Sequence, residues 1–373
     1  MKVFIFHATA GYGHQKVAEV IGSAFRERGF SDRDLRVQDA LDFTSPFFRA
    51  LYPAIYFYAV KYLPDIWGWF YETSDKKSVY SYIRGFRSLV NRLEGRRLLA
   101  HVFREKPDVI LCTHFFSAEL LSRAKREGRI TAKIVTVVTD FLPHTFCVNE
   151  GTDFYWIMSE EGKTELRNRG VPETNIVSGG IPVDPRFNPF GKRLEILRKH
   201  GFEDGRLTLL LTSGSFGLGP HAAILNQLDF FADRIQCFVV CGKNNELRHS
   251  LDATAFRFPV KIFGFVDFMP ELMEASDLMI AKSGGSTTVE SLTKGIPMVV
   301  LHPIPGQETR NAAILKERNA AFFMQEPAQI KPIVGTILSQ PEILDVKRAT
   351  MRLLARPHAA GDLVNFVLQG RVR

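Results

Sequence analysis

The sequence predicts an α/β protein with two doubly wound, Rossmann-like domains. Short apolar runs of the kind buried in parallel sheets recur along the chain and alternate with helical patterns. The pattern restarts after a proline- and glycine-rich segment at residues 179–190, which we interpret as a linker. A length of 373 residues also suits two domains. Two such domains facing a central cleft would bind ligands in that cleft.

The first half begins with a strand, a glycine-containing loop and a helix over residues 14–28, whose apolar face ends before Gly29. A helical stretch at 117–125 separates two apolar runs and completes a βαβ unit. The strands expected in this half are residues 2–6, 109–112, 134–139, 154–158 and 176–177.

The second half repeats this layout, with helices between its strands. Two of the strands are followed by glycine-rich turns, at residues 213–219 and 282–288. The strands expected in this half are residues 207–211, 237–241, 260–263, 278–280 and 298–301.

Positive charge and aromatic side chains are concentrated in adjacent segments. The whole chain has 48 Lys and Arg against 40 Asp and Glu, whereas residues 76–106 alone hold nine against two. Residues 41–71 contain twelve of the 43 aromatic side chains. This combination fits a phosphate, a nucleic acid or an anionic membrane surface. Nucleic acid is disfavoured, because no recognised binding module accompanies the basic stretch.

Three absences bear on the location of the protein. No uninterrupted apolar run approaches about 18 residues, so no membrane-spanning helix is expected. The first apolar run is too short for a secretory signal. The four cysteines form no C-x-x-C pair, which favours packing roles in a reduced, cytoplasmic setting.

The first loop carries Gly11, Tyr12, Gly13 and His14 at the start of a helix. The helix dipole there favours a neutral imidazole, so His14 is either a general base or only a capping residue. Asp140 follows a buried strand, where it would orient His14, take a substrate proton or cap a turn.

The two glycine-rich turns of the second half offer backbone N–H groups at helix starts, which together would hold a diphosphate. Glu290, one helical turn further on, is positioned for a ribose diol. Gln307 and Glu308 follow two prolines and a glycine, in either a sugar-binding loop or a stiff surface loop. The residues expected at the diphosphate are Ser213, Gly214, Ser215, Gly217, Gly284, Gly285, Ser286 and Thr287.

Six motifs occur in one order and together resemble a known family. They are G-Y-G-H-Q-K-V-A at 11–18, V-T-D-F at 138–141, G-I-P-V at 180–183, V-V-C-G-K-N at 239–244, G-G-S-T-T-V-E at 284–290 and P-I-P-G-Q-E at 303–308. Over residues 1–355 the chain resembles bacterial diacylglycerol glucosyltransferases and plant monogalactosyldiacylglycerol synthases, of glycosyltransferase family 28. Ser283 and the stretch 145–147 depart from the family pattern.

The resemblance implies a GT-B fold, an inverting mechanism, a UDP-sugar as donor substrate, and no essential metal or other cofactor. It implies that His14 and Asp140 lie beside the acceptor hydroxyl and that Glu290 contacts the ribose. Gln307 and Glu308 would contact the donor sugar. Phe263 and Phe265 would lie where the backbone reads the uracil.

The expected function is transfer of a hexose from a UDP-sugar to the hydroxyl of diacylglycerol or a glycosyl-diacylglycerol. The alternatives are a UDP-N-acetylglucosamine-dependent transferase acting on another lipid-linked acceptor, and a UDP-sugar epimerase or sensor with the same fold. We expect an acceptor- and membrane-binding domain at 1–182, a UDP-sugar-binding domain at 183–355, and a C-terminal helix at 356–373 that packs toward the first domain.

A lipid acceptor requires contact with the bilayer, so we expect a peripheral protein on the cytoplasmic face of an anionic membrane. The aromatic segment would insert at the interface and the following basic helix would contact lipid headgroups. Alternatively, the aromatic rings fill the core and the basic face is solvated. The residues expected at the membrane are Phe47, Phe48, Trp67, Trp69, Arg84, Arg87, Arg92 and Arg96.

Overall fold

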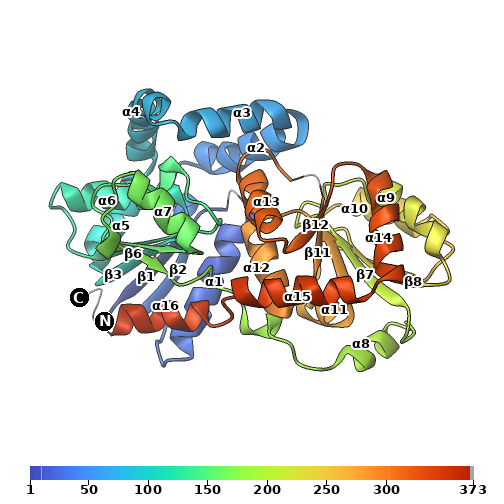
Figure 1. The fold of residues 1–373 in the computed structure, drawn as a ribbon. Coiled ribbons are helices and arrows are strands. Elements are labelled where there is room, and N and C mark those ends of the chain that lie inside the picture. The colour runs from blue at the N-terminus through green and yellow to red at the C-terminus, as the bar shows by residue number, and fades with distance from the viewer. Residues whose placement is uncertain (10, 302, 370–373) are drawn as a thin grey trace. The chain divides into compact units, whose positions relative to one another are not determined.

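A computed structural model describes residues 1–9, 11–301 and 303–369 of the chain (Figure 1). The chain divides into two compact units. The first unit comprises residues 1–184, 305–310 and those from 356 onward, and the second comprises 185–304 and 311–355. Each unit is built on one sheet of six parallel strands.

The sheet of the first unit is doubly wound. Its chain order reverses between β1 and β3, which are hydrogen-bonded neighbours. Phe4 and Phe6 of β1 belong to a buried cluster with residues of α5 and α6, so these helices pack on one face of the sheet. The strands, in sheet order, are β2 (Leu35–Asp39), β1 (Val3–His7), β3 (Val109–Cys112), β4 (Lys133–Val137), β5 (Phe154–Ile157) and β6 (Ile176–Ser178).

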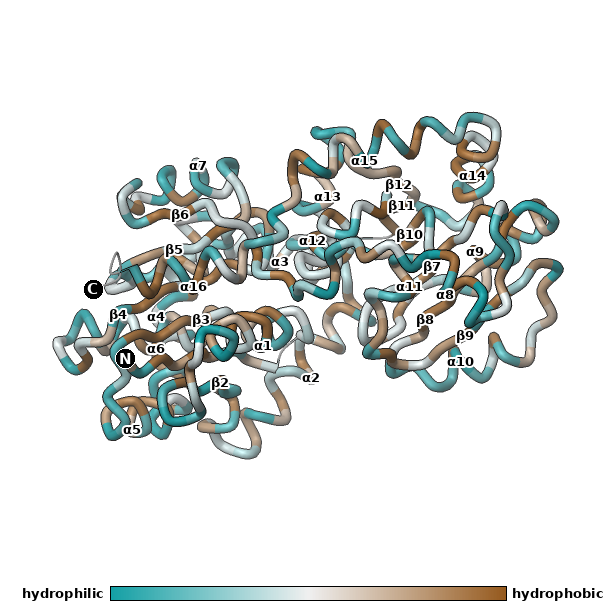
Figure 2. The backbone as a smooth tube through the Cα atoms, turned by 90° about the horizontal axis from the view of Figure 1, so that it is seen from below, coloured by the Kyte–Doolittle hydropathy of each residue, from teal (hydrophilic) through white to brown (hydrophobic). Residues whose placement is uncertain are grey.

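The helices of the first unit include a long insertion. Four helices, α2 to α5, connect β2 to β3, whereas no other connection between strands of this unit contains more than one α-helix. The last helix, α16, is largely hydrophobic along its length (Figure 2) and packs against α1. The helices are α1 (Tyr12–Arg26), α2 (Pro46–Tyr62), α3 (Pro64–Asp75), α4 (Lys77–Glu94), α5 (Arg96–Glu105), α6 (Phe115–Arg126), α7 (Glu160–Asn168) and α16 (Ala359–Leu368).

The second unit repeats the doubly wound plan. Its chain order reverses between β7 and β10, which pair in register. The strands, in sheet order, are β12 (Ala321–Met324), β11 (Met298–Leu301), β10 (Leu278–Ala281), β7 (Leu207–Thr212), β8 (Ile235–Val240) and β9 (Val260–Phe263). The helices are α8 (Arg193–Lys199), α9 (His221–Leu228), α10 (Asn245–Asp252), α11 (Met269–Ala275), α12 (Gly285–Lys294), α13 (Gln307–Glu317, which starts in the first unit), α14 (Ile330–Ser339) and α15 (Glu342–Leu354).

The predicted strands are all present, and those at 109–112, 260–263 and 298–301 have the predicted bounds. The sequence pattern did not predict β2 or β12. Both lie at an edge of their sheet. β2 mixes polar and apolar residues, so its apolar signal is weak. β12 is a run of only four residues, all apolar, which the prediction missed. In the described part of the chain, no helix combines the length and the apolar character needed to cross a bilayer.

Candidate active site

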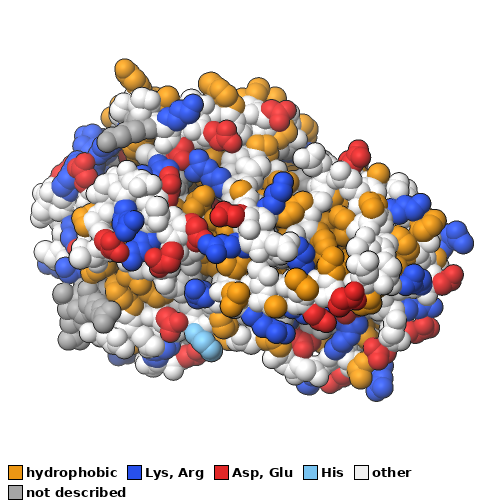
Figure 3. All heavy atoms as spheres, viewed as in Figure 1, with side chains coloured by type: hydrophobic (Ala, Val, Ile, Leu, Met, Phe, Trp, Pro, Cys, Tyr) orange, Lys and Arg blue, Asp and Glu red, His pale blue; other side chains and the backbone are white. Residues whose placement is uncertain are grey.

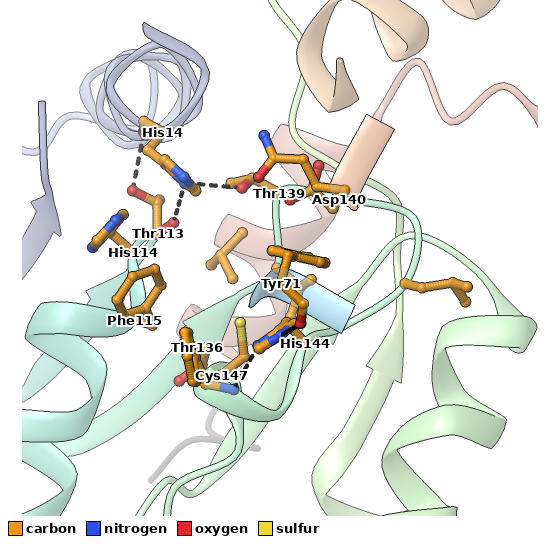
Figure 4. Close-up of a pocket in the computed structure, with 15 residues that line it drawn as sticks. His14, Tyr71, Thr113, His114, Phe115, Thr136, Thr139, Asp140, His144 and Cys147 are labelled. Carbon is orange, nitrogen blue, oxygen red and sulfur yellow. Dashed lines mark hydrogen bonds between the residues drawn. The ribbon is translucent and has the colours of Figure 1, made fainter. Parts of the chain in front are cut away.

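The candidate site of the first unit lies where its sheet changes direction. His14 is in the first turn of the helix that follows β1, Thr113 follows β3, and Asp140 follows β4. Because these three strands are parallel neighbours, the segments that leave their carboxyl ends meet at one edge of the sheet. The structure brings His14 and Asp140 into the lining of one pocket there (Figure 4).

The imidazole of His14 is held in one tautomer. Its Nδ1 lies 2.8 Å from the carbonyl oxygen of Thr113 and 2.9 Å from the hydroxyl oxygen of Thr139. A carbonyl can only accept, so Nδ1 carries the proton and donates it there. In the neutral ring the lone pair therefore lies on Nε2. The hydroxyl of Thr113 donates to the carbonyl of His14 at 3.0 Å and fixes the same turn.

Electrostatics keep this imidazole neutral near pH 7. Burial lowers the pKa of His14 below its usual value, and the negative charge of Asp140 opposes part of that shift. A neutral imidazole with its lone pair on Nε2 can accept a proton from a hydroxyl placed in the pocket. The arrangement therefore suits a general base assisted by a nearby carboxylate.

Two further histidines in the pocket lining act as local caps. Nδ1 of His114 accepts the backbone N–H of Phe116 at 3.2 Å, and Nδ1 of His144 accepts that of Phe146 at 3.1 Å. The Nε2–H of His144 donates to the carbonyl of Tyr71 at 3.0 Å. Burial lowers the pKa of His114 well below its usual value and that of His144 to about 4. Both rings are neutral structural elements.

The remaining walls of the pocket are largely apolar, with Phe115, Phe146 and Tyr71 among them. The Tyr71 ring lies 4.3 Å from the His144 ring, between centroids. Burial, and then the charge of Asp140, raise the pKa of Tyr71 well above its usual value, so the phenol stays protonated. The pocket thus combines one base and one carboxylate with aromatic walls.

The segment 305–310 brings the predicted sugar-binding residues to this unit. Gln307 lines the same pocket as His14 and Asp140, and its Nε2 donates to the hydroxyl of Tyr56 at 3.4 Å. The Glu308 side chain is buried. Burial chiefly, then Glu308 and Asp140, raise the pKa of Tyr56. These residues lie more than 160 positions from Asp140 in the chain, and no local sequence pattern indicates that they share a pocket with it.

In the second unit the two glycine-rich turns also lie at the point where the sheet changes direction. They follow β7 and β10, which are neighbours, so the turns meet at adjacent strand ends. Gly214 and Gly217 have φ values of +76° and +59°, which favour glycine. Gly284 precedes α12, and Gly285, Ser286 and Thr287 form its first turn, where backbone N–H groups have no acceptor within the helix and point toward its N-terminal end.

Two of the predicted donor-binding side chains point into the protein. Ser213 is buried, and its hydroxyl lies 3.4 Å from Nε2 of His221, whose Nδ1–H donates to the Gly219 carbonyl at 3.1 Å. Phe263 packs against Phe268, with ring centroids 5.6 Å apart. These two side chains support the turns from within, and only their backbones remain candidates for ligand contact. By contrast, Phe265 is 48% exposed, and Ser215 and Glu290 are partly exposed.

The residues predicted at the membrane divide into two groups. Phe47 and Trp69 are 74% and 67% exposed. Phe48 packs on Phe116, with ring centroids 5.9 Å apart, and Trp67 packs on Tyr56 at 5.2 Å. Phe48 and Trp67 therefore belong to the interior side of their helices, as the alternative interpretation expected.

The prediction that Arg87 contacts the membrane is wrong. Its side chain is only 13% exposed, pairs with Glu119 at 2.8 Å, and lies 4.2 Å from the centroid of the Phe146 ring. A buried counter-ion and the aromatic ring hold the guanidinium inside, so it is unavailable to a lipid headgroup. Arg84, Arg92 and Arg96 are exposed as predicted.

Within residues 1–9, 11–301 and 303–369, no group of three or more His, Cys, Asp or Glu side chains is placed to hold a metal ion. Three of the cysteines are buried, and the fourth, Cys147, is partly buried in the pocket lining; burial raises the pKa of its thiol to about 12.

Two family models match the chain in succession. Residues 14–183 match the model of monogalactosyldiacylglycerol (MGDG) synthase, and residues 208–337 match that of the glycosyltransferase family 28 C-terminal domain. The first match contains His14 and Asp140, and the second contains both glycine-rich turns, Gln307 and Glu308.

Similar proteins carry names that agree with these models. The chain is 28% identical to a processive diacylglycerol beta-glucosyltransferase of Bacillus cereus, over 98% of this chain and 93% of the relative. It is also 28% identical to a protein of the same name from Staphylococcus epidermidis, over 94% and 88%.

Solved structures share the fold at lower identity. MurG of Acinetobacter baumannii superposes with a TM-score of 0.62 at 15% identity, over 99% of this chain and 100% of that chain. The UDP-GlcNAc 2-epimerase of Neisseria meningitidis, bound to UDP-GlcNAc, gives a TM-score of 0.61 at 15% identity, over 99% and 100%. The predicted α/β class, with two doubly wound units of GT-B type, is confirmed.

Proposed function

Because the chain belongs to glycosyltransferase family 28, we propose that it transfers a hexose from a UDP-sugar to the hydroxyl of diacylglycerol or a glycosyl-diacylglycerol. One observation carries this proposal: His14 presents the Nε2 lone pair of a neutral imidazole in a pocket shared with Asp140 and Gln307. The names of the two bacterial relatives support the lipid acceptor.

The proposed reaction is a single in-line displacement. The acceptor oxygen forms a bond to the anomeric carbon of the hexose, while the bond from that carbon to the UDP phosphate oxygen breaks. The acceptor proton passes to Nε2 of His14, and the bonding pair leaves with UDP. One displacement inverts the configuration at the anomeric carbon. A correctly positioned general base typically accelerates such a step by about 10²- to 10⁴-fold.

The leaving diphosphate gains negative charge, which the second unit is suited to stabilise without a metal. The first turn of α12 and the turn after β7 supply backbone N–H groups, and α12 adds its N-terminal dipole. We assign the ribose to Glu290, the hexose to Gln307 and Glu308, and the uracil to the backbone near Phe265.

A lipid acceptor requires the enzyme to reach the bilayer, and we propose that α2, α3 and α4 form the contact surface. Exposed apolar side chains repeat at helical spacing along α2 and α4. Figure 3 shows hydrophobic side chains on the surface of the region that these helices form in Figure 1. We call this set the apolar stripe: Phe47, Leu51, Ile55, Tyr58, Tyr62, Ile66, Trp69, Phe70, Tyr82, Phe86, Leu89 and Leu93.

The proposed partner of the apolar stripe is an anionic lipid bilayer on the cytoplasmic side. The stripe runs into the segment 76–106, which carries nine Lys and Arg against two Glu. Exposed arginines beside exposed aromatic rings are typical of helices that lie in a membrane interface. Each basic residue near an anionic surface contributes roughly 1 kcal/mol to binding.

Vesicle flotation tests the membrane contact. Wild-type protein is expected to float with vesicles that contain anionic lipid and to bind zwitterionic vesicles less. Replacing Arg84, Arg92 and Arg96 by glutamate should abolish flotation on anionic vesicles. The control replaces Arg352, an exposed arginine of α15 in the second unit, by glutamate. Flotation unaffected by the triple substitution would contradict the proposal.

Transfer assays test the reaction itself. The protein is incubated with diacylglycerol and each radiolabelled donor in turn: UDP-glucose, UDP-galactose and UDP-N-acetylglucosamine. Lipids are then separated by chromatography, and the expected result is a labelled glycosyl-diacylglycerol from one UDP-hexose. Interconversion of the UDP-sugars without lipid product would instead identify an epimerase, and binding without any product a sensor.

A further inference from the structure

The α3 helix holds the segment 305–310 along one of its faces. Gly68, Tyr71 and Asp75 lie on this face, at spacings of three and four residues. They contact Pro305, Gly306 and Arg310 respectively. All six residues belong to the first unit.

Two of these contacts depend on glycine. A Cβ atom at Gly68 would lie 2.4 Å from the Cβ of Pro305, which is closer than two non-bonded carbon atoms can approach. Gly306 has a φ of +97°, and a Cβ there would lie 2.7 Å from the ring of Tyr71. The helix and the segment therefore approach each other more closely than any other residue type would permit at these positions.

The third contact is an ion pair between a partly buried arginine and a buried carboxylate. Nη2 of Arg310 lies 2.6 Å from Oδ2 of Asp75, whose side chain is only 8% exposed, and the guanidinium lies 5.4 Å from the Tyr71 ring centroid. Asp75 also accepts two hydrogen bonds from Arg169, both at 2.9 Å, and one from the backbone N–H of Thr145 at 2.7 Å.

These contacts fix the residues that lie between them. Gln307 and Glu308 stand between Gly306, held by Tyr71, and Arg310, held by Asp75. Because the segment is fastened on both sides, the Gln307 side chain has a defined place in the lining of the pocket. A charge-assisted contact to a carboxylate that Arg169 and Thr145 already hold in place is a rigid anchor.

We propose that Asp75 and Arg310 are a positioning pair, which sets Gln307 and Glu308 for the donor hexose. This inference rests on the function proposed above. The pair acts on the sugar through its neighbours and touches no substrate itself. It is therefore expected to govern recognition of the hexose in a UDP-hexose and to leave recognition of the UDP portion unchanged.

The test compares binding of UDP-hexose with binding of UDP alone. Arg310→Gln removes one arm of the pair but leaves Asp75 bonded to Arg169. Equilibrium titration should show an affinity for UDP-hexose that is reduced by about tenfold to a hundredfold, because Gln307 and Glu308 no longer meet the hexose in the right place. The affinity for UDP should stay within about twofold of wild type. Arg310→Lys retains the charge and should recover most of the loss.

Arg169→Gln is the matched control, because it removes a partner of the same carboxylate without touching the segment 305–310. It should lower the thermal midpoint and keep the wild-type ratio of UDP-hexose to UDP affinity. The inference would be overturned if Arg310→Gln lost equal affinity for UDP-hexose and UDP. It would also be overturned if Arg169→Gln changed the ratio of the two affinities. Either result would mean that the pair only stabilises the fold. If Arg310→Gln does not fold, the test rests on the other two variants. Arg310→Lys is then expected to keep the wild-type ratio of UDP-hexose to UDP affinity. A selective loss of UDP-hexose affinity in a stably folded Arg169→Gln would overturn the inference.

Failure of the proposed function has a different signature. It would appear in the wild-type protein, as no transfer of a hexose to lipid; if the wild-type protein also bound no UDP-hexose, both proposals would be overturned. Failure of the positioning role would appear only in the comparison among variants, while the wild-type protein binds and transfers normally.

Discussion

The two units share a sheet of six parallel strands that changes direction near its middle, yet they offer different chemistry at that place. The first unit presents side chains, with His14 and Asp140 in one pocket. The second presents glycine-rich turns and the start of α12. Proton transfer requires a side chain with a suitable pKa, whereas a diphosphate can be held by backbone N–H groups. The architecture therefore fixes where each site lies, and the loop residues fix what it can do.

The largest expected effect is in the first unit. His14→Ala removes the proposed base, and kcat for sugar transfer should fall by about 10²- to 10⁴-fold with little change in the KM of the UDP-sugar. Gln15→Ala is the control, since Gln15 donates along α1 to Glu19 at 2.8 Å, and it should keep wild-type turnover. Turnover near wild type in His14→Ala would remove His14 from the mechanism.

The second unit should respond to backbone changes. A Cβ at Gly217, whose φ is +59°, would lie 2.0 Å from the carbonyl oxygen of Cys241. Gly217→Ala must move that turn, and we expect a loss of about 2–4 kcal/mol in the free energy of unfolding. Chemical denaturation and UDP affinity would measure the effect.

Gly214→Ala provides the comparison within the same turn. Gly214 also has a positive φ, +76°, but open space surrounds the position of its Cβ. Only the backbone preference is lost there, so the expected cost is about 1 kcal/mol. Equal losses in the two variants would show that the contact with Cys241 is unimportant.

The sequence predicted more of the fold than of the site's surroundings. Buried parallel strands are apolar throughout, so Val109–Cys112 was predictable to the residue, whereas the edge strand Leu35–Asp39 mixes polar and apolar residues. His14 and Asp140 were identified together because both follow strands of one parallel sheet.

Contacts made by charged residues far apart in the chain were not predictable. Arg87 lies on an amphipathic basic helix, where an arginine normally faces solvent, and only the fold brings Glu119 beneath it. Asp75 and Arg310 are 235 positions apart. No local pattern indicates that the segment 305–310 packs on α3, so the place of Gln307 in the pocket required the structure.

The acid limb of the pH profile distinguishes the two units, because the proposed binding of the diphosphate by the second unit rests on backbone N–H groups, which do not titrate in this range. Burial lowers the pKa of His14, so the ring stays neutral at pH 7 and loses its lone pair only as pH falls through that lowered value. We expect kcat/KM to be flat near neutrality and then to fall about tenfold per pH unit below a midpoint under 6.5.

Asp140→Asn sharpens this measurement. The negative charge of Asp140 raises the pKa of His14, so its removal should move the acid limb to still lower pH. Stability must be followed in parallel: the folded pKa of His144 is about 4, so native stability falls as pH drops from about 6.5 toward that value. If the acid limb stays at the same pH in Asp140→Asn, the charge of Asp140 does not affect the pKa of His14.

The smallest expected effect separates two serines of one turn. The hydroxyl of buried Ser213 can donate only inward, to Nε2 of His221, whereas Ser215 is partly exposed. Ser213→Ala should cost about 1 kcal/mol of unfolding free energy and leave UDP affinity within about twofold, because the turn keeps its backbone donors. Ser215→Ala should weaken UDP binding by about three- to tenfold if its hydroxyl contacts the diphosphate. Calorimetric titration of UDP against both variants measures this, and a larger affinity loss in Ser213→Ala would mean that its hydroxyl turns toward the ligand on binding.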